Sequence, residues 1–202
     1  MMAVSPRRED RRIQRTRQLL KRASIEIMQK KGVPATSIQE ITERANVNRG
    51  TFYDHFADKY ALLETLIRDE FHHLVCVLPP VSYWNSSVLQ HLIQLVLENF
   101  RDVQRRCRPL GDIDPLTQRI IQEELAVLLL AWLTEKRKKG VQDTVSLQTA
   151  AGTMSWAILG AALQWSLEPG SMASEQMAHG IVLLLLHGVA HLTDEDTPDQ
   201  YK

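Results

Sequence analysis

Residues 36–59 read TSIQEITERANVNRGTFYDHFADK and carry the clearest structural signal in this chain of 202 residues. Thr36 and Ser37 can cap the first of two short helices, because a hydroxyl oxygen accepts a hydrogen bond from a first-turn backbone N–H. Residues 46–48 read Asn-Val-Asn, which favours a tight turn, and Asn48 can cap the second helix. Two short helices joined by a tight turn are typical of a helix-turn-helix.

The composition of these two helices favours DNA recognition. Reading the major groove requires a short helix with hydrogen-bonding side chains, held at a fixed angle by apolar residues. The second helix supplies Arg49, Thr51, Tyr53 and His55, and Lys59 follows at the start of the next helix, where an ammonium can reach a phosphate. Six apolar residues can clamp the two helices together: Ile38, Ile41, Ala45, Val47, Phe52 and Phe56.

The run GTFYDHFADK, residues 50–59, resembles the signature of the TetR/AcrR family, and the resemblance extends over roughly residues 11–67. The rest of the chain is similar to that family only in length and helical pattern. The resemblance implies that the first three helices bind DNA and that the fourth links them to a ligand-binding, dimerising core. One departure is Asn46, where the family often has glycine. Asparagine also tolerates a left-handed backbone, so we expect the turn to form.

The resemblance also implies which residues contact DNA. Tyr53 and His55 match positions that contact the DNA backbone, and Lys59 matches a phosphate-binding lysine. Arg49 and Thr51 match positions that face bases or phosphates. The full predicted set is Thr36, Ser37, Gln39, Asn48, Arg49, Thr51, Tyr53, His55 and Lys59. Without the resemblance, Tyr53 could simply pack the module, and His55 would more often be an ordinary surface histidine.

The remaining sequence predicts further helices and no strand, since apolar residues recur at three- and four-residue spacing. Helices are expected at about 11–31, from 59 to the Pro79-Pro80 pair, from Ser86 or Ser87 to beyond Val103, and at 115–139, 146–167 and 174–192. The expected fold is all-α. An N-terminal three-helix helix-turn-helix module would occupy residues 1–58, and a C-terminal helical ligand-binding and dimerisation domain residues 59–202.

Charge is unevenly spread along a chain whose formal net charge is zero. Residues 1–60 hold 13 Lys and Arg against 7 Asp and Glu, whereas residues 61–202 hold 11 against 17. A basic end favours contact with nucleic acid or an anionic membrane, although a solvated basic face gives the same count. No signal-peptide pattern opens the sequence, and the two cysteines lack metal-type spacing, so we expect a cytoplasmic protein.

Aromatic residues in the second part could line an apolar cavity. We expect it between the fourth helix and the helices containing residues 89–103 and 116–133, where few charges interrupt the apolar pattern. Pockets of this type are lined mostly by apolar side chains. The candidate ligand-binding residues are Phe71, Phe100, Trp132 and Trp156. Each tryptophan, taken singly, is more often a core or interface residue than a ligand contact.

The last two predicted helices favour a homodimer. Residues 146–167 are rich in Ala, Gly and Ser, which let helices approach closely, and residues 174–192 are apolar on more than one side. A helix that is apolar nearly all round must be buried. Two such helices per subunit can form a four-helix seam with a second copy. Burial within a single chain is the alternative.

These patterns together favour a ligand-responsive transcriptional regulator, a repressor that a small apolar effector releases from double-stranded operator DNA. The alternatives are an all-helical enzyme and a membrane-surface protein held by its basic N-terminus. The sequence contains no catalytic constellation, and His187 and His191 have no third metal ligand nearby, so no enzyme activity, cofactor or metal is expected. The expected partners are operator DNA, an apolar effector and a second copy, with no membrane.

Overall fold

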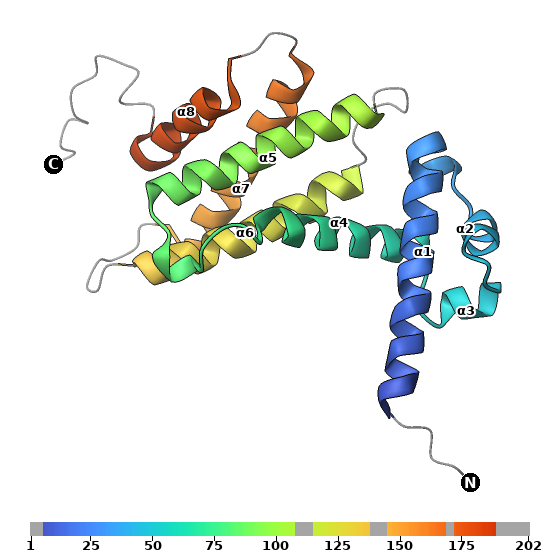
Figure 1. The fold of residues 1–202 in the computed structure, drawn as a ribbon. Coiled ribbons are helices and arrows are strands. Elements are labelled where there is room, and N and C mark those ends of the chain that lie inside the picture. The colour runs from blue at the N-terminus through green and yellow to red at the C-terminus, as the bar shows by residue number, and fades with distance from the viewer. Residues whose placement is uncertain (1–5, 108–114, 138–144, 169–171, 189–202) are drawn as a thin grey trace, which may run out of the picture. The chain divides into compact units, whose positions relative to one another are not determined.

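A computed structural model describes residues 6–107, 115–137, 145–168 and 172–188. Within these ranges the chain is helical and forms no strand, so the predicted all-α class is confirmed (Figure 1). The helices are α1 (Pro6–Ala35), α2 (Ile38–Ala45), α3 (Arg49–Tyr53), α4 (Lys59–Val75), the 3₁₀ turn η1 (Val81–Tyr83), α5 (Ser86–Cys107), α6 (Pro115–Lys136), α7 (Leu147–Leu167) and α8 (Ser174–His187).

The chain divides into two compact units. The amino-terminal unit comprises residues 1–70 with 106–117, and the carboxy-terminal unit comprises 71–105 with 118–202. Helix α4 therefore begins in the first unit and ends in the second. The domain boundary expected after residue 58 stays a prediction.

One hydrophobic cluster holds α1 to α4 together in the amino-terminal unit. Its buried members are Leu20, Ala23, Ile41, Ala45, Phe52, Phe56 and Leu62, and Ile27, Ile38, Val47 and Leu66 pack against them. All six residues expected to clamp the helix-turn-helix take part: Ile41, Ala45, Phe52 and Phe56 as members, and Ile38 and Val47 packed against them. Burial of these side chains provides most of the stability of helices as short as α2 and α3, which could not persist alone.

Helix α1 is longer than the predicted span of 11–31. The backbone does leave the helical region at Gly32, where φ is 80° and ψ is 164°. A further turn then follows to Ala35 and contains Pro34. Proline fits a first helical turn, because its missing N–H has no partner to lose there.

Caps account for most of the other helix ends. Ser37 and Asn48 accept first-turn N–H bonds as predicted, and Asp58 and Ser146 cap α4 and α7 in the same way. Helix α5 begins at Ser86, but its cap is Asn85, whose Oδ1 accepts from the Val88 N–H at 3.0 Å. The prediction that α8 reaches residue 192 was wrong: it ends at His187, because Gly188 adopts a φ of 69°, which a helix cannot continue.

The carboxy-terminal unit buries one stripe from each of α5 to α8. Its core comprises Leu89, Leu92, Ile93, Val96, Leu97, Phe100, Ile120, Leu125, Leu129, Trp132, Ala151, Met154, Ile158, Leu159, Ala162, Trp165, Ala178, Ile181 and Val182. Polar contacts add to it: Gln122 donates to Ser155 Oγ at 2.8 Å, and the Arg101 guanidinium stacks on the Trp165 ring. In the ranges described, no helix is both long and apolar enough to cross a membrane.

Candidate nucleic-acid interface

The turn between α2 and α3 has the backbone conformation expected of it. Asn46 lies in the left-handed region, with φ 54° and ψ 48°. Its N–H donates to the Glu43 carbonyl at 3.2 Å, and the Val47 N–H donates to the Thr42 carbonyl at 3.0 Å. Asparagine thus replaces glycine here without loss of the turn.

Asn48 organises the start of α3. Its Oδ1 accepts from the Thr51 N–H at 2.7 Å and from the Thr51 hydroxyl at 3.1 Å. A Cβ atom on Gly50 would lie only 3.1 Å from the same oxygen. The cap therefore explains why the smallest residue occupies position 50.

Arg49 and Tyr53 form the exposed polar side of α3. Both side chains face solvent, and Arg49 Nη2 lies 3.4 Å from the Tyr53 hydroxyl. Phe52 is fully buried, and its ring meets the Tyr53 ring edge-on with centroids 5.6 Å apart. The buried Phe52 ring thus anchors α3 with its polar side outward. Thr51 and His55 are half-buried beside this surface.

Helix α2 adds exposed polar side chains to this unit. Ser37 and Glu40 form a capping box: Ser37 Oγ accepts from the Glu40 N–H, and Glu40 Oε2 accepts from the Ser37 N–H at 3.0 Å. Hydrogen bonds from Lys31 and Ser37 lower the pKa of Glu40 to about 2. Gln39 is exposed and donates to Glu43 at 2.9 Å.

Two predicted DNA-contacting residues, Thr36 and Lys59, direct their polar groups to carbonyls within the protein. Thr36 is buried, and its hydroxyl donates to the Gly32 carbonyl at 2.7 Å, so its side chain is not available to a phosphate. Thr36 lies between α1 and α2, where its side chain turns back onto the last turns of α1. The Lys59 ammonium donates to the carbonyls of Val33, Pro34 and Thr36.

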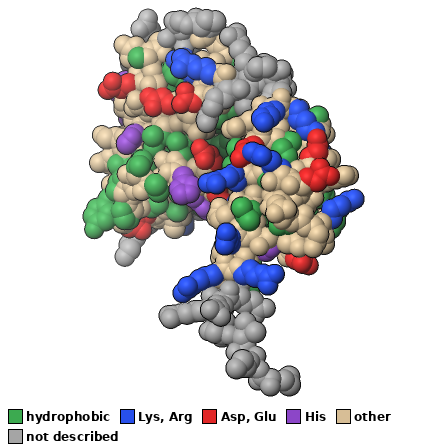
Figure 2. Space-filling view, turned by 45° about the vertical axis from the view of Figure 1, so that its right-hand side comes forward, with side chains coloured by type: hydrophobic (Ala, Val, Ile, Leu, Met, Phe, Trp, Pro, Cys, Tyr) green, Lys and Arg blue, Asp and Glu red, His purple; other side chains and the backbone are tan. Residues whose placement is uncertain are grey.

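Basic side chains continue along α1. Arg11, Arg12 and Arg15 are exposed, and Figure 2 shows Lys and Arg side chains gathered next to the grey residues at the lower end of the view. Arg17 instead lies over the Phe56 ring, 4.8 Å from its centroid. The first turns of α1 therefore present positive charge to solvent.

The four candidate effector-binding residues do not share one environment. Phe71, Phe100 and Trp132 are buried in the carboxy-terminal unit, whereas Trp156 is 54% exposed on α7. The structure thus does not place Trp156 in the interior of the single chain. The buried Trp132 Nε1 atom has no hydrogen-bond partner among the residues described.

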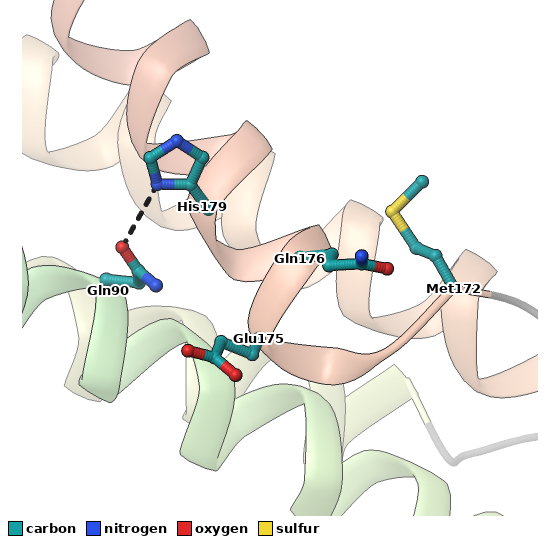
Figure 3. Close-up of a pocket in the computed structure, with 5 residues that line it drawn as sticks. All are labelled: Gln90, Met172, Glu175, Gln176 and His179. Carbon is teal, nitrogen blue, oxygen red and sulfur yellow. Dashed lines mark hydrogen bonds between the residues drawn. The ribbon is translucent and has the colours of Figure 1, made fainter.

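An open pocket lies elsewhere in the same unit, between α5 and the start of α8 (Figure 3). It is lined by Gln90, Met172, Glu175, Gln176 and His179, and His179 Nδ1 lies 3.3 Å from Gln90 Oε1. None of the four candidate aromatic residues lines it. Four of the five residues that line it have polar side chains, so it is not the aromatic-lined cavity that the sequence predicts.

Comparison with known proteins assigns the helix-turn-helix. Residues 20–66 match the family described as bacterial regulatory proteins, tetR family. These residues therefore form a helix-turn-helix domain of the TetR family. YxbF of Bacillus subtilis, an uncharacterised HTH-type transcriptional regulator, is 42% identical to this chain over 60 residues. That match covers 29% of this chain and 16% of the length of YxbF.

Solved TetR-family structures share the fold. A TetR transcriptional regulator from Streptococcus agalactiae is 22% identical, with a TM-score of 0.62, over 90% of this chain and 99% of its own. FadR of Thermus thermophilus, a TetR-family transcriptional repressor solved with lauroyl-CoA, is 24% identical, with a TM-score of 0.58. That likeness covers 92% of this chain and 100% of FadR.

Sequence reasoning missed two features of this TetR-family domain. The capping box at Ser37 and Glu40 could have been found, because Ser-x-x-Glu before an apolar-periodic segment is its known pattern. The three bonds of Lys59 had no sequence signal, since they join residues 23 to 26 positions apart.

Proposed function

We propose that this chain is a dimeric, ligand-responsive transcriptional regulator that reads operator DNA with α3. The observation that carries the proposal is the exposed pair Arg49 and Tyr53 on a short helix anchored by the buried Phe52. Arginine and tyrosine side chains hydrogen-bond to base edges and phosphates in the major groove. Ser37, Gln39, Asn48, Thr51 and His55 complete the proposed DNA surface.

The charge of the amino-terminal region supports the same proposal. Exposed Arg11, Arg12 and Arg15 on α1 add positive charge to the unit that carries α3. Neutralising phosphates releases counterions from DNA, so binding should weaken steeply as salt rises. A basic arm ahead of a helix-turn-helix can also enter the adjacent minor groove.

The test begins with selection of a binding sequence from a random duplex DNA library by the full chain. Tyr53→Ala is then compared with Tyr83→Ala, which removes an exposed tyrosine from η1 in the other unit. We expect Tyr53→Ala to weaken binding to the selected duplex about ten-fold, the effect of losing roughly 1.4 kcal/mol, and Tyr83→Ala to leave it unchanged. Equal binding by both variants would contradict the role of α3.

The proposed dimer would form through α7 and α8. In the single chain, Trp156 and Leu167 on α7 and Leu184 and Leu186 on α8 are exposed large apolar residues. Gly160 also lies on the exposed side of α7, and a Cβ atom there would meet nothing within 4 Å. Apolar side chains next to a small residue allow two helices to pack closely against symmetry mates.

The proposed effector is an apolar molecule with a hydrogen-bond acceptor. Buried Phe71, Phe100 and Trp132 offer apolar contact, and the unpartnered Trp132 Nε1–H offers one donor. Leaving a buried donor unsatisfied costs roughly 1–3 kcal/mol, which a ligand acceptor would recover. FadR of Thermus thermophilus was solved with lauroyl-CoA, whose lauroyl chain and carbonyl oxygen have this chemistry, whereas its CoA portion is polar and charged.

Regulation would follow from linkage between the two ligands. Two recognition helices of a dimer bind successive major grooves about 34 Å apart. An effector that binds better to a dimer with another spacing shifts the population away from the DNA-binding form. We propose repression, released by the effector, as the default mode.

A further inference from the structure

Lys59, the first residue of α4, engages all its hydrogen-bond donors within the protein. Its Nζ lies 3.1 Å from the Val33 carbonyl, 3.0 Å from the Pro34 carbonyl and 2.9 Å from the Thr36 carbonyl. An ammonium group has three N–H donors and no acceptor. These three oxygens therefore use its full hydrogen-bonding capacity.

The three acceptors lie where α1 ends: the Val33 carbonyl also accepts from the Thr36 N–H at 3.2 Å, and the Pro34 and Thr36 carbonyls follow it. The last carbonyls of a helix have no N–H four residues ahead, and they form the negative end of its dipole. Gly32 breaks α1 just before them, at a φ of 80°. The Thr36 hydroxyl donates to the Gly32 carbonyl at 2.7 Å. The Lys59 ammonium donates to the carbonyls of Val33, Pro34 and Thr36.

The bonds of Lys59 hold the segment that joins α1 to α2. We define the α1–α2 corner as residues 32–37; it ends at Ser37, which caps α2. Lys59 therefore ties the start of α2 to the first turn of α4. Further along α4, Asp69 forms an ion pair with the buried Lys21 of α1, so α4 is attached to α1 at two places.

We infer that Lys59 is a positioning residue for DNA recognition, which holds the α1–α2 corner in place and does not neutralise a DNA phosphate. The inference rests on the proposed DNA binding. It departs from the phosphate contact that the family resemblance implies for this position. A phosphate contact would require Lys59 to give up carbonyl bonds that the corner would then lack.

Salt dependence separates the two roles. Each neutralised phosphate contributes about 0.9 to the slope of log affinity against log salt concentration. Loss of a phosphate contact lowers that slope, whereas loss of a positioning residue weakens binding at every salt concentration and leaves the slope unchanged. A disturbed corner also exposes backbone amides to exchange in the free protein, which loss of a phosphate contact does not do.

The experiment compares Lys59→Met with Lys30→Met in the full chain. Methionine keeps an unbranched apolar stem and removes the ammonium, and Lys30 is an exposed lysine of α1 outside the corner. Binding to the selected duplex is measured from low to high salt, and backbone amide exchange is measured without DNA. We expect Lys59→Met to bind at least ten-fold more weakly with an unchanged slope, and to exchange faster at residues 33–41. Lys30→Met should leave exchange in this segment unchanged.

A slope reduced by about 0.9 for each subunit of Lys59→Met would overturn the inference and restore the phosphate contact. Unchanged exchange at residues 33–41 would overturn it as well. If Lys59→Met does not fold, Lys59→Gln keeps two donors on a shorter neutral side chain and takes its place. Failure of the wild-type chain to select any duplex would contradict the proposed function instead, and amide exchange in the free chain would still test the corner.

Discussion

Ser37 and Glu40 form a capping box at the start of α2. Each side chain accepts the N–H of the other residue, and Lys31 also donates to the Glu40 carboxylate. These bonds favour the ionised carboxylate, which is why the pKa of Glu40 falls from 4.5 to about 2. The lowered pKa means that the charged form of Glu40 stabilises the fold.

Stability should therefore depend on pH through Glu40. The contribution is fully present above pH 4.5, where an unfolded-state glutamate is ionised, and is lost as pH falls from there towards 2. Glu40→Gln keeps an acceptor oxygen but not the charge, so it should lower the midpoint of thermal unfolding at pH 7. The difference from wild type should vanish near pH 2. Glu43→Gln, one turn outside the box, is the control, and a difference that is constant over this pH range would contradict the assignment.

At the scale of the element, α3 is stabilised by contacts with the rest of its unit. Five residues are too few for a stable isolated helix. Its stability must come from the Asn48 cap at one end and from Phe52, buried among residues of α1, α2 and α4. Loss of the cap should therefore affect both folding and the direction of Arg49 and Tyr53.

Two substitutions of Asn48 distinguish capping from DNA contact. Asn48→Ala removes the acceptor and should cost about 1 kcal/mol of stability. Asn48→Asp restores an acceptor for the Thr51 N–H but places a negative charge on the proposed DNA surface. We expect chemical denaturation to show near wild-type stability for the aspartate variant, while its binding to the selected duplex stays weak. Recovery of DNA binding together with stability would mean that Asn48 only caps α3.

The sequence predicted those elements whose determinants are local. The caps at Ser37 and Asn48, the left-handed Asn46 and the six-residue apolar clamp follow from neighbouring residues or helical spacing. The burial of Thr36 and the bonds of Lys59 depend on how α1 meets α4, which no local pattern encodes. The exposure of Trp156 likewise depends on the direction in which α7 packs, because a helix apolar on several sides gives no preferred face.

At the scale of the whole molecule, DNA recognition by a dimer needs two copies of α3 at a fixed separation. That separation is set by the dimer contact, which we place on the exposed apolar side of α7 and α8. The same α4 that Lys59 attaches to α1 continues into the carboxy-terminal unit. We therefore propose α4 as the element that links effector binding to the DNA-reading helices.

Gly160→Arg tests the proposed dimer contact. Since nothing lies within 4 Å of a Cβ atom at this position, the single chain can accept the arginine without rearrangement. In a close helix seam the same side chain would bury an unpaired charge, which is strongly unfavourable. Light scattering should show a folded monomer for Gly160→Arg and a dimer for the control Ser82→Arg, which adds arginine at an exposed site in η1. A dimeric Gly160→Arg variant would place the interface elsewhere.

Effector binding and DNA binding should weaken each other by the same factor, because linkage between two ligands is reciprocal. Dodecanoate is a suitable probe, since it joins an apolar chain to an acceptor for the unpartnered Trp132 N–H. We expect it to change tryptophan fluorescence and to lower affinity for the selected duplex.

Trp132→Phe should weaken dodecanoate binding about five-fold, as expected for losing one hydrogen bond worth roughly 1 kcal/mol. Trp84→Phe is the matched control, because the buried Trp84 N–H already donates to the Pro79 carbonyl at 2.8 Å. Dodecanoate that binds without changing duplex affinity would exclude this site as the inducer site, and equal effects of the two tryptophan variants would remove Trp132 from it.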